Sequence, residues 1–226
     1  MLLLFFCFRE AKPVAVDATM GVTIEKGPEA ERKEEHENSL EDAKKIAITF
    51  DDGPHPVYTE MLLDGLKERG VQASFFVLGK NAEIYPELVS RQQEEGHLIG
   101  NHTYSHLQLT KANAEKYEQE LLQTAKLLKD ITGQEIQYVR PPYGAWNKKY
   151  EEKWNMFPVL WNIDPRDWNC NSADLIANRV ISKAADHGII LLHDEYESSV
   201  LAAFQIIDAL QKQGYEFVTV DEILFD

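Results

Sequence analysis

A chain of 226 residues with 44% apolar residues is long enough for one globular domain and a short appendage. Its formal net charge of −15 argues against nucleic acid as a partner, because phosphate binding needs clustered Lys and Arg. The sequence has no Cys-x-x-Cys pair and no Gly-x-Ser-x-Gly motif, which excludes a thiolate zinc cluster and the nucleophile elbow of a serine hydrolase.

Two segments of different composition precede the first predicted strand. Residues 1–8 (MLLLFFCF) are strongly apolar, but they are far shorter than the ~20 residues that span a bilayer and lack the basic start of a signal peptide. They fit either an apolar terminus or the tail of a membrane anchor. Residues 25–42 are dense in charge and fit a solvated linker or a loose helix. We therefore expect a leader over residues 1–43 and a folded domain over 44–226.

From Lys45 onward, short apolar runs alternate with amphipathic stretches. Runs of this length suit strands that are buried on both faces of a parallel sheet. They are Ile46–Phe50, Ala73–Leu78, Leu98–Asn101, Tyr138–Arg140, Pro158–Asn162, Ile189–His193 and Phe217–Val220. The stretches between them predict helices over Tyr58–Arg69, Glu83–Glu95, Asn113–Thr132, Ser172–Ala185 and Ser199–Gln213. This alternation predicts an α/β fold, either a barrel one unit short of eight or an open doubly wound sheet.

The first run leads directly into Asp51-Asp52-Gly53-Pro54. Adjacent carboxylates are costly to bury without partners, and successive side chains on an extended chain point in different directions. One carboxylate can therefore bind a cation while its neighbour has another role, although spacing does not say which does which. On its own, the segment also fits a solvated turn.

The third run leads into His102-Thr103-Tyr104-Ser105-His106. Histidines at i and i+4 share one face if this piece is helical, close enough to hold one metal ion. Two imidazoles and one carboxylate with open positions suit a catalytic divalent metal, zinc by default, with cobalt, manganese or nickel as alternatives.

The fourth run leads into Arg140-Pro141-Pro142-Tyr143-Gly144. Arg140 can orient a carboxylate through a bidentate contact, and the rigid backbone can present the Tyr143 N–H to a developing oxyanion. A structural turn with an ordinary surface arginine is the alternative.

Two later strand ends carry further candidates. Asp164 is a candidate partner for a histidine or for Arg140, and Trp168 can wall an apolar pocket or stack on a sugar ring. His193 leaves the sixth run, where it is placed to act as a general acid near neutral pH. Each residue alone fits a structural role. All the clusters, however, follow strand ends that share one face in parallel α/β folds, and this predicts an active site there.

Five segments together resemble the ordered motifs of the polysaccharide deacetylases, carbohydrate esterase family 4. They are TFDDGP (49–54), HTYSH (102–106), RPPYG (140–144), DPRDW (164–168) and LLHD (191–194). The resemblance covers roughly residues 45–225. It implies a distorted (β/α) barrel with about seven parallel strands, and a metal-dependent deacetylase as the domain over 44–226.

The resemblance also implies a role for each matching residue. Asp52, His102 and His106 would bind the metal, with Asp51 as general base. Arg140 would orient Asp51, and the Tyr143 amide would contribute to the oxyanion hole. Asp164 would tune His193, the general acid. Trp168 and Leu191 would line the pocket for the acetyl methyl group.

The expected activity is hydrolysis of N-acetyl groups on N-acetylglucosamine units of a polysaccharide, first peptidoglycan and next chitin oligomers. Acetylxylan esterase activity and non-catalytic glycan binding are the alternatives. Such a substrate implies a place in the cell envelope or outside the cell, with a membrane tether if residues 1–8 end an anchor. We expect the protein to be a monomer.

Overall fold

The structure is a computed structural model that describes residues 43–225, apart from the side chains of residues 150–152. The apolar start and the charged run of the predicted leader lie outside these residues. No helix within 43–225 is long and apolar enough to cross a bilayer.

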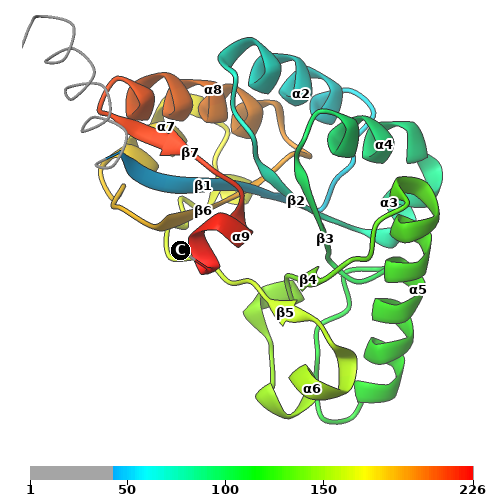
Figure 1. The fold of residues 1–226 in the computed structure, drawn as a ribbon. Coiled ribbons are helices and arrows are strands. Elements are labelled where there is room, and N and C mark those ends of the chain that lie inside the picture. The colour runs from blue at the N-terminus through cyan, green and yellow to red at the C-terminus, as the bar shows by residue number, and fades with distance from the viewer. Residues whose placement is uncertain (1–42, 226) are drawn as a thin grey trace, which may run out of the picture. The chain divides into compact units, whose positions relative to one another are not determined.

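Seven parallel strands form one curled sheet (Figure 1). The strands pair in the order β5-β4-β3-β2-β1-β6, and β7 pairs with the start of β1. Their bounds are β1 (Lys44–Asp51), β2 (Ser74–Val77), β3 (Leu98–Asn101), β4 (Tyr138–Val139), β5 (Phe157–Pro158), β6 (Gly188–His193) and β7 (Tyr215–Phe217). The predicted distorted (β/α) barrel is confirmed.

Helices α2, α4, α5, α7 and α8 lie around the outer side of the sheet (Figure 1). The α-helices are α2 (Tyr58–Arg69), α3 (Gly79–Ile84), α4 (Pro86–Glu94), α5 (Ala114–Thr132), α6 (Glu151–Trp154), α7 (Ala173–Ile181), α8 (Glu197–Gln211) and α9 (Val220–Leu224). Three 3₁₀ turns are η1 (Pro142–Gly144), η2 (Lys148–Tyr150) and η3 (Asp167–Asn169). The site-bearing segments therefore follow the carboxyl ends of the strands.

Alternation along β1 divides the core into two layers. Ile46, Ile48 and Phe50 are buried in the outer layer, with side chains from α2 and α8. Burying each of these side chains contributes about 1.5–3 kcal/mol. The intervening positions face the inside of the barrel, where Ala47 packs in a small cluster with Phe76, Val159 and Val220. Asp51 belongs to this inward-facing row and is the last residue of β1. Its carboxylate therefore lies at the mouth of the barrel.

The sheet closes through backbone that follows β5. Ile163 forms a parallel bridge with Ile190 of β6, and the Leu191 N–H donates to the Ile163 carbonyl at 2.9 Å. The ladder thus continues from β5 to β6 around the barrel. It also fixes the loop over 164–168 next to the end of β6.

Three predicted elements differ clearly from the structure. The predicted strand over Pro158–Asn162 is the two-residue β5, Phe157–Pro158. The predicted helix over Glu83–Glu95 is two helices, because Pro86 lacks the N–H that would continue the first of them. The predicted strand over Phe217–Val220 ends at Phe217, and α9 begins at Val220. Thr219 and Glu222 form a capping box that stabilises the start of α9 instead of extending the strand.

Candidate metal-dependent active site

The turn after β1 separates the two adjacent aspartates. Asp51 is the last strand residue, and Asp52 has a left-handed backbone with φ 74°. The Asn81 amide donates to the Asp52 carbonyl at 2.7 Å, so α3 holds this turn. The Asp194 carboxylate packs against Gly53, where a Cβ would lie 2.3 Å from an Asp194 oxygen. Only glycine fits there, and the turn directs the carboxylates of Asp51 and Asp52 to different partners.

Arg140 holds Asp51 from inside the barrel. Its Nη1 donates to Asp51 Oδ1 at 2.8 Å, and both side chains are buried. Burial raises the pKa of Asp51 above its ordinary value, although the charge of Arg140 opposes this shift. The guanidinium lies over the Phe76 ring, 4.1 Å from its centroid. The predicted contact between Arg140 and Asp51 is therefore present, and it fixes a carboxylate that binds protons more readily than an exposed one.

Asp52, His102 and His106 come together as predicted, but not on a helix. The segment after β3 is a loop in which Thr103 and His106 have left-handed backbones, with φ 65° and 64°. The two histidines therefore do not share a helical face, the arrangement under which their spacing would bring them together. The loop nevertheless places the two imidazole rings 5.0 Å apart, centroid to centroid.

Helix α5 and the end of β3 fix this loop. The Asn101 side chain accepts from the Thr103 N–H at 2.8 Å and donates to the Leu121 carbonyl at 2.9 Å. Glu120 accepts from both the backbone N–H and the hydroxyl of Ser105, at 2.9 and 2.8 Å. Hydrogen bonds from a packed helix thus replace the helical geometry that the spacing suggested.

The donor set fits a divalent metal ion. Asp52 Oδ1 lies 3.5 Å from His102 Nε2 and 3.6 Å from His106 Nε2, and the three ligand atoms are all within 4.8 Å of one another. Tetrahedral ligands bound at about 2.1 Å would lie about 3.4 Å apart. Asp52 Oδ1 is buried, with no hydrogen-bond partner among residues 43–225. A bound cation would satisfy this oxygen.

The protonation state and the tautomer of His102 suit a metal ligand. Burial lowers its pKa to about 3, so the ring is neutral at neutral pH. Its Nδ1 lies 2.6 Å from the Arg140 carbonyl, which can only accept, so Nδ1 carries the proton. The lone pair is therefore on Nε2, the atom that faces Asp52.

His193 pairs with Asp167, and the predicted pairing with Asp164 is wrong. Asp167 Oδ1 lies 2.9 Å from His193 Nδ1, while its Oδ2 accepts from the His193 N–H at 2.8 Å. The Ser199 hydroxyl also donates to Asp167 Oδ2, at 2.7 Å. Asp164 instead accepts from the Arg166 N–H at 2.7 Å. Arg166 has a left-handed backbone, and η3 then begins at Asp167, which is turned inward and buried.

Asp167 is the largest influence that raises the pKa of His193. Burial alone would lower the pKa of His193. The hydrogen bond and charge of Asp167, together with the charges of Asp51 and Asp52, outweigh burial and raise this pKa to about 9. His193 is therefore protonated at neutral pH, the state from which an imidazole can donate a proton. The segment DPRDW offered two aspartates, and only the position of Asp167 directly before Trp168 set it apart in the sequence.

All predicted site residues except Arg140 line one pocket of about 370 Å³. Tyr143, Trp168 and Leu191 supply its apolar wall, and Tyr143 packs with its ring centroid 4.8 Å from that of His106. Trp161, to which sequence reasoning gave no role, completes the lining. Asp164 also reaches the pocket. The structure thus gathers in one cavity the segments that follow five different strands.

Comparisons with known proteins agree with this architecture. The family model described as polysaccharide deacetylase matches residues 39–158. The peptidoglycan-N-acetylglucosamine deacetylase PgdA of Listeria monocytogenes is 41% identical over 180 residues, which cover 80% of this chain and 39% of that protein. The peptidoglycan-N-acetylmuramic acid deacetylase PdaC of Bacillus subtilis is also 41% identical over 180 residues, covering 80% of this chain and 38% of PdaC.

A solved structure of PdaC has a TM-score of 0.78 with this chain at 40% identity, covering 81% of this chain and 91% of the solved one. The chain spans about two fifths of the length of these two curated relatives. Because the match extends over most of the folded domain in both sequence and structure, the chain belongs to the polysaccharide deacetylase family.

Proposed function

We propose that this chain is a metal-dependent hydrolase that removes acetyl groups from N-acetylglucosamine units of a polysaccharide, with release of acetate. One observation carries the proposal. A buried carboxylate held by Arg140 and a protonated imidazole held by Asp167 share one pocket with the Asp52, His102 and His106 donor set. This arrangement provides a base, an acid and a cation site around a single reacting group.

Each side chain of the site has one role in the proposed hydrolysis. A divalent ion held by Asp52, His102 and His106 would lower the pKa of a bound water to roughly 7 and polarise the substrate carbonyl. Asp51, whose pKa is raised by burial, accepts the proton of the attacking water. His193 donates its proton to the leaving nitrogen, without which an amide C–N bond breaks poorly.

The pocket wall supplies the remaining contacts. The Tyr143 N–H donates to the carbonyl oxygen as that oxygen gains negative charge, a contribution of about 3–4 kcal/mol for one such donor. Trp168 and Leu191 form the wall that receives the acetyl methyl group. The products are acetate and a free amino sugar.

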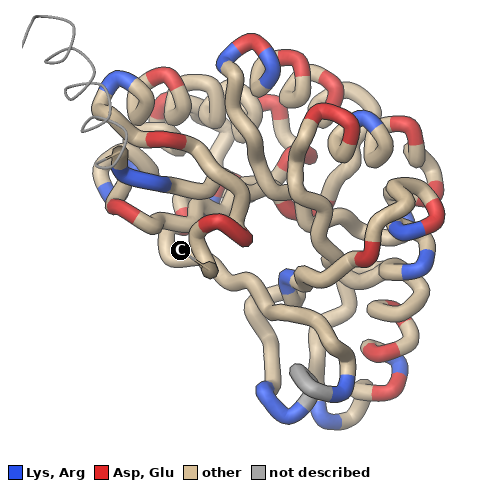
Figure 2. Tube along the Cα trace, in the orientation of Figure 1, with Lys and Arg blue, Asp and Glu red and all other residues tan. Residues whose placement is uncertain are grey.

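We propose zinc as the ion, with cobalt, manganese or nickel as alternatives, since two imidazoles and one carboxylate suit these metals. Peptidoglycan is the proposed polymer, and chitin oligomers come next. The names of PgdA and PdaC support this choice. On the outer helices, acidic and basic residues are interspersed (Figure 2), a surface suited to a glycan more than to nucleic acid.

The proposed substrate implies a place in the cell envelope or outside the cell. We assign the catalytic domain to residues 44–226 and a leader, tether or linker to residues 1–43. We propose that the domain acts as a monomer.

Acetate release by the purified chain tests this function. The substrates are peptidoglycan, N-acetylglucosamine oligomers and acetylxylan, each with added zinc. Release from the first two should exceed release from acetylxylan and should be abolished by Asp51→Asn. Asp130→Asn, on the exposed side of α5, is the matched control and should retain full activity. Faster release from acetylxylan would show that the chain is an esterase. If acetate is released from none of the three substrates, the proposed enzymatic function is refuted.

A further inference from the structure

Thr49 lies deep in the barrel, two residues before Asp51 on the same inward row of β1. It has no exposed surface. Its Oγ1 is 2.5 Å from Arg140 Nη1 and 2.6 Å from the carbonyl oxygen of Ile190. Thr49 therefore touches both the arginine that holds Asp51 and the strand that ends in His193.

The donor and acceptor groups of Thr49, Arg140 and Ile190 determine which atom donates in each hydrogen bond. Arginine has only donors, so the Thr49 oxygen accepts from Nη1. The single hydroxyl hydrogen must then go to the Ile190 carbonyl, which can only accept. Nη1 has two hydrogens, and the second goes to Asp51 Oδ1 at 2.8 Å. One nitrogen thus joins Thr49 to Asp51, with no freedom to exchange partners.

Few other polar contacts orient this guanidinium. Nε donates to the Val159 carbonyl at 3.1 Å, and Nη2 has no hydrogen-bond partner among residues 43–225. The Phe76 ring packs against one face of the guanidinium but supplies no acceptor. Without the Thr49 oxygen, Nη1 would retain one acceptor, Asp51 itself, and the guanidinium could tilt about that contact.

We propose that Thr49 is a positioning residue for catalysis, which orients Arg140 and through it the base Asp51. Thr49 also ties this arginine to β6, where Asp51 lies in register with His193. The hydroxyl thereby helps fix the distance between the base and the acid. This inference rests on the proposed function, and it gives a role to Thr49, which the proposed function leaves without one.

The alternative is a purely structural threonine, and paired variants distinguish the two. Thr49→Val keeps the β-branched shape and removes both hydrogen bonds, whereas Thr49→Ser preserves the hydroxyl. Ile48→Val, one residue away in the outer layer, perturbs the core without touching Arg140. The readouts are kcat and KM for acetate release from N-acetylglucosamine oligomers, and the zinc content of each variant.

Thr49→Val should lower kcat by about ten- to a hundredfold with KM within about twofold, because a small misplacement of a reacting group has this effect. Thr49→Ser and Ile48→Val should stay near wild type, and all variants should hold equal zinc. If Thr49→Val does not fold, Thr49→Ala against Thr49→Ser gives the same contrast, because only serine keeps the hydroxyl.

A Thr49→Val or Thr49→Ala variant with the kcat of Thr49→Ser would overturn the positioning role. So would a loss of activity in Ile48→Val equal to that in Thr49→Val. An inactive wild type would instead refute the proposed function, so the two failures are distinguishable.

Discussion

Asp167 is a buried carboxylate that favours the charged state of the His193 imidazole. It accepts from the ring and the backbone of His193 and from Ser199, so its orientation is fixed on three sides. Charge-assisted hydrogen bonds of this kind favour the protonated imidazole. Asp167 does not line the pocket, but together with the charges of Asp51 and Asp52 it favours the protonated form of His193.

Removing the charge of Asp167 should move the basic limb of the pH–rate profile. In the wild type, His193 loses its proton as the pH rises through its pKa of about 9, and the rate falls there. In Asp167→Asn, burial dominates and lowers this pKa, so kcat/KM should fall at a lower pH. Asp164→Asn should leave the limb in place. A shift in Asp164→Asn and none in Asp167→Asn would contradict the pairing seen in the structure.

The sequence points to the segment that contains Asp167, but Asp164, the expected partner of His193, is the wrong aspartate of the two. Both carboxylates of DPRDW lie in a loop, where no periodicity says which side chain turns inward. The choice depends on the left-handed backbone of Arg166 and on the short turn that starts at Asp167. Asp51, Asp52, His102 and His106 were easier to predict, because strand ends and motif spacing place them together.

At the scale of elements, α5 supports the loop over residues 102–106, which carries the proposed metal ligands His102 and His106. Glu120 is buried, and it holds Ser105, the residue before His106, through two hydrogen bonds. The His-x-x-x-His spacing suggested a helix, but the histidines lie in a loop that a neighbouring helix supports. A capping box was also visible at Thr219 and Glu222, and it would have predicted the start of α9 in place of a longer strand.

Glu120→Ala should weaken metal binding by about tenfold or more, as loss of a residue supporting a ligand typically does. The dissociation constant for zinc, measured by competition with a chelating dye, checks this. Glu118→Ala is the control, since Glu118 lies on the same helix and pairs with Lys153 instead. Equal affinities in the two variants would show that the loop holds His106 without α5.

At the scale of the whole molecule, the barrel could be predicted, but its closure could not. Seven apolar runs alternating with amphipathic stretches indicated parallel strands and outer helices, and both are present. The bridge between Ile163 and Ile190 lies beyond the short strand β5, in a segment whose pairing depends on distant backbone. Interior positions such as Thr49 and Arg140 meet only once the barrel has closed.

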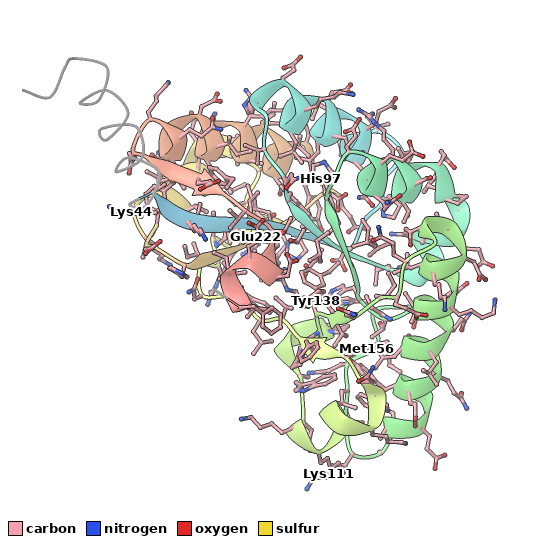
Figure 3. All side chains as sticks on the ribbon, viewed as in Figure 1. Lys44, His97, Lys111, Tyr138, Met156 and Glu222 are labelled. Atoms are coloured by element: carbon pink, nitrogen blue, oxygen red, sulfur yellow. The ribbon has the colours of Figure 1, made fainter. Side chains whose placement is uncertain are left out.

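The stability of the barrel should depend on a histidine remote from the site. His97 lies immediately before β3 (Figure 3), with Nδ1 accepting from the Ala73 N–H at 3.1 Å. Burial lowers its pKa to about 4. Between pH 6.5 and 4 the unfolded chain binds a proton that the folded chain excludes, so stability falls with falling pH.

This loss should be about 2 kcal/mol between pH 7 and pH 5. His97→Gln removes the titrating group, so its free energy of unfolding should fall less over the same range. Urea unfolding of both proteins at the two pH values measures the difference. Parallel losses in wild type and variant would contradict a neutral buried His97.

Acetate release from N-acetylglucosamine oligomers, as zinc is returned to chelated protein, tests the central claim most directly. Activity should be absent after chelation and should rise to a plateau at one zinc per chain, because Asp52, His102 and His106 form one donor set. Asp52→Ala should show no such rise. Full activity in the chelated protein, or no activity at any zinc concentration, would contradict a metal-dependent deacetylase.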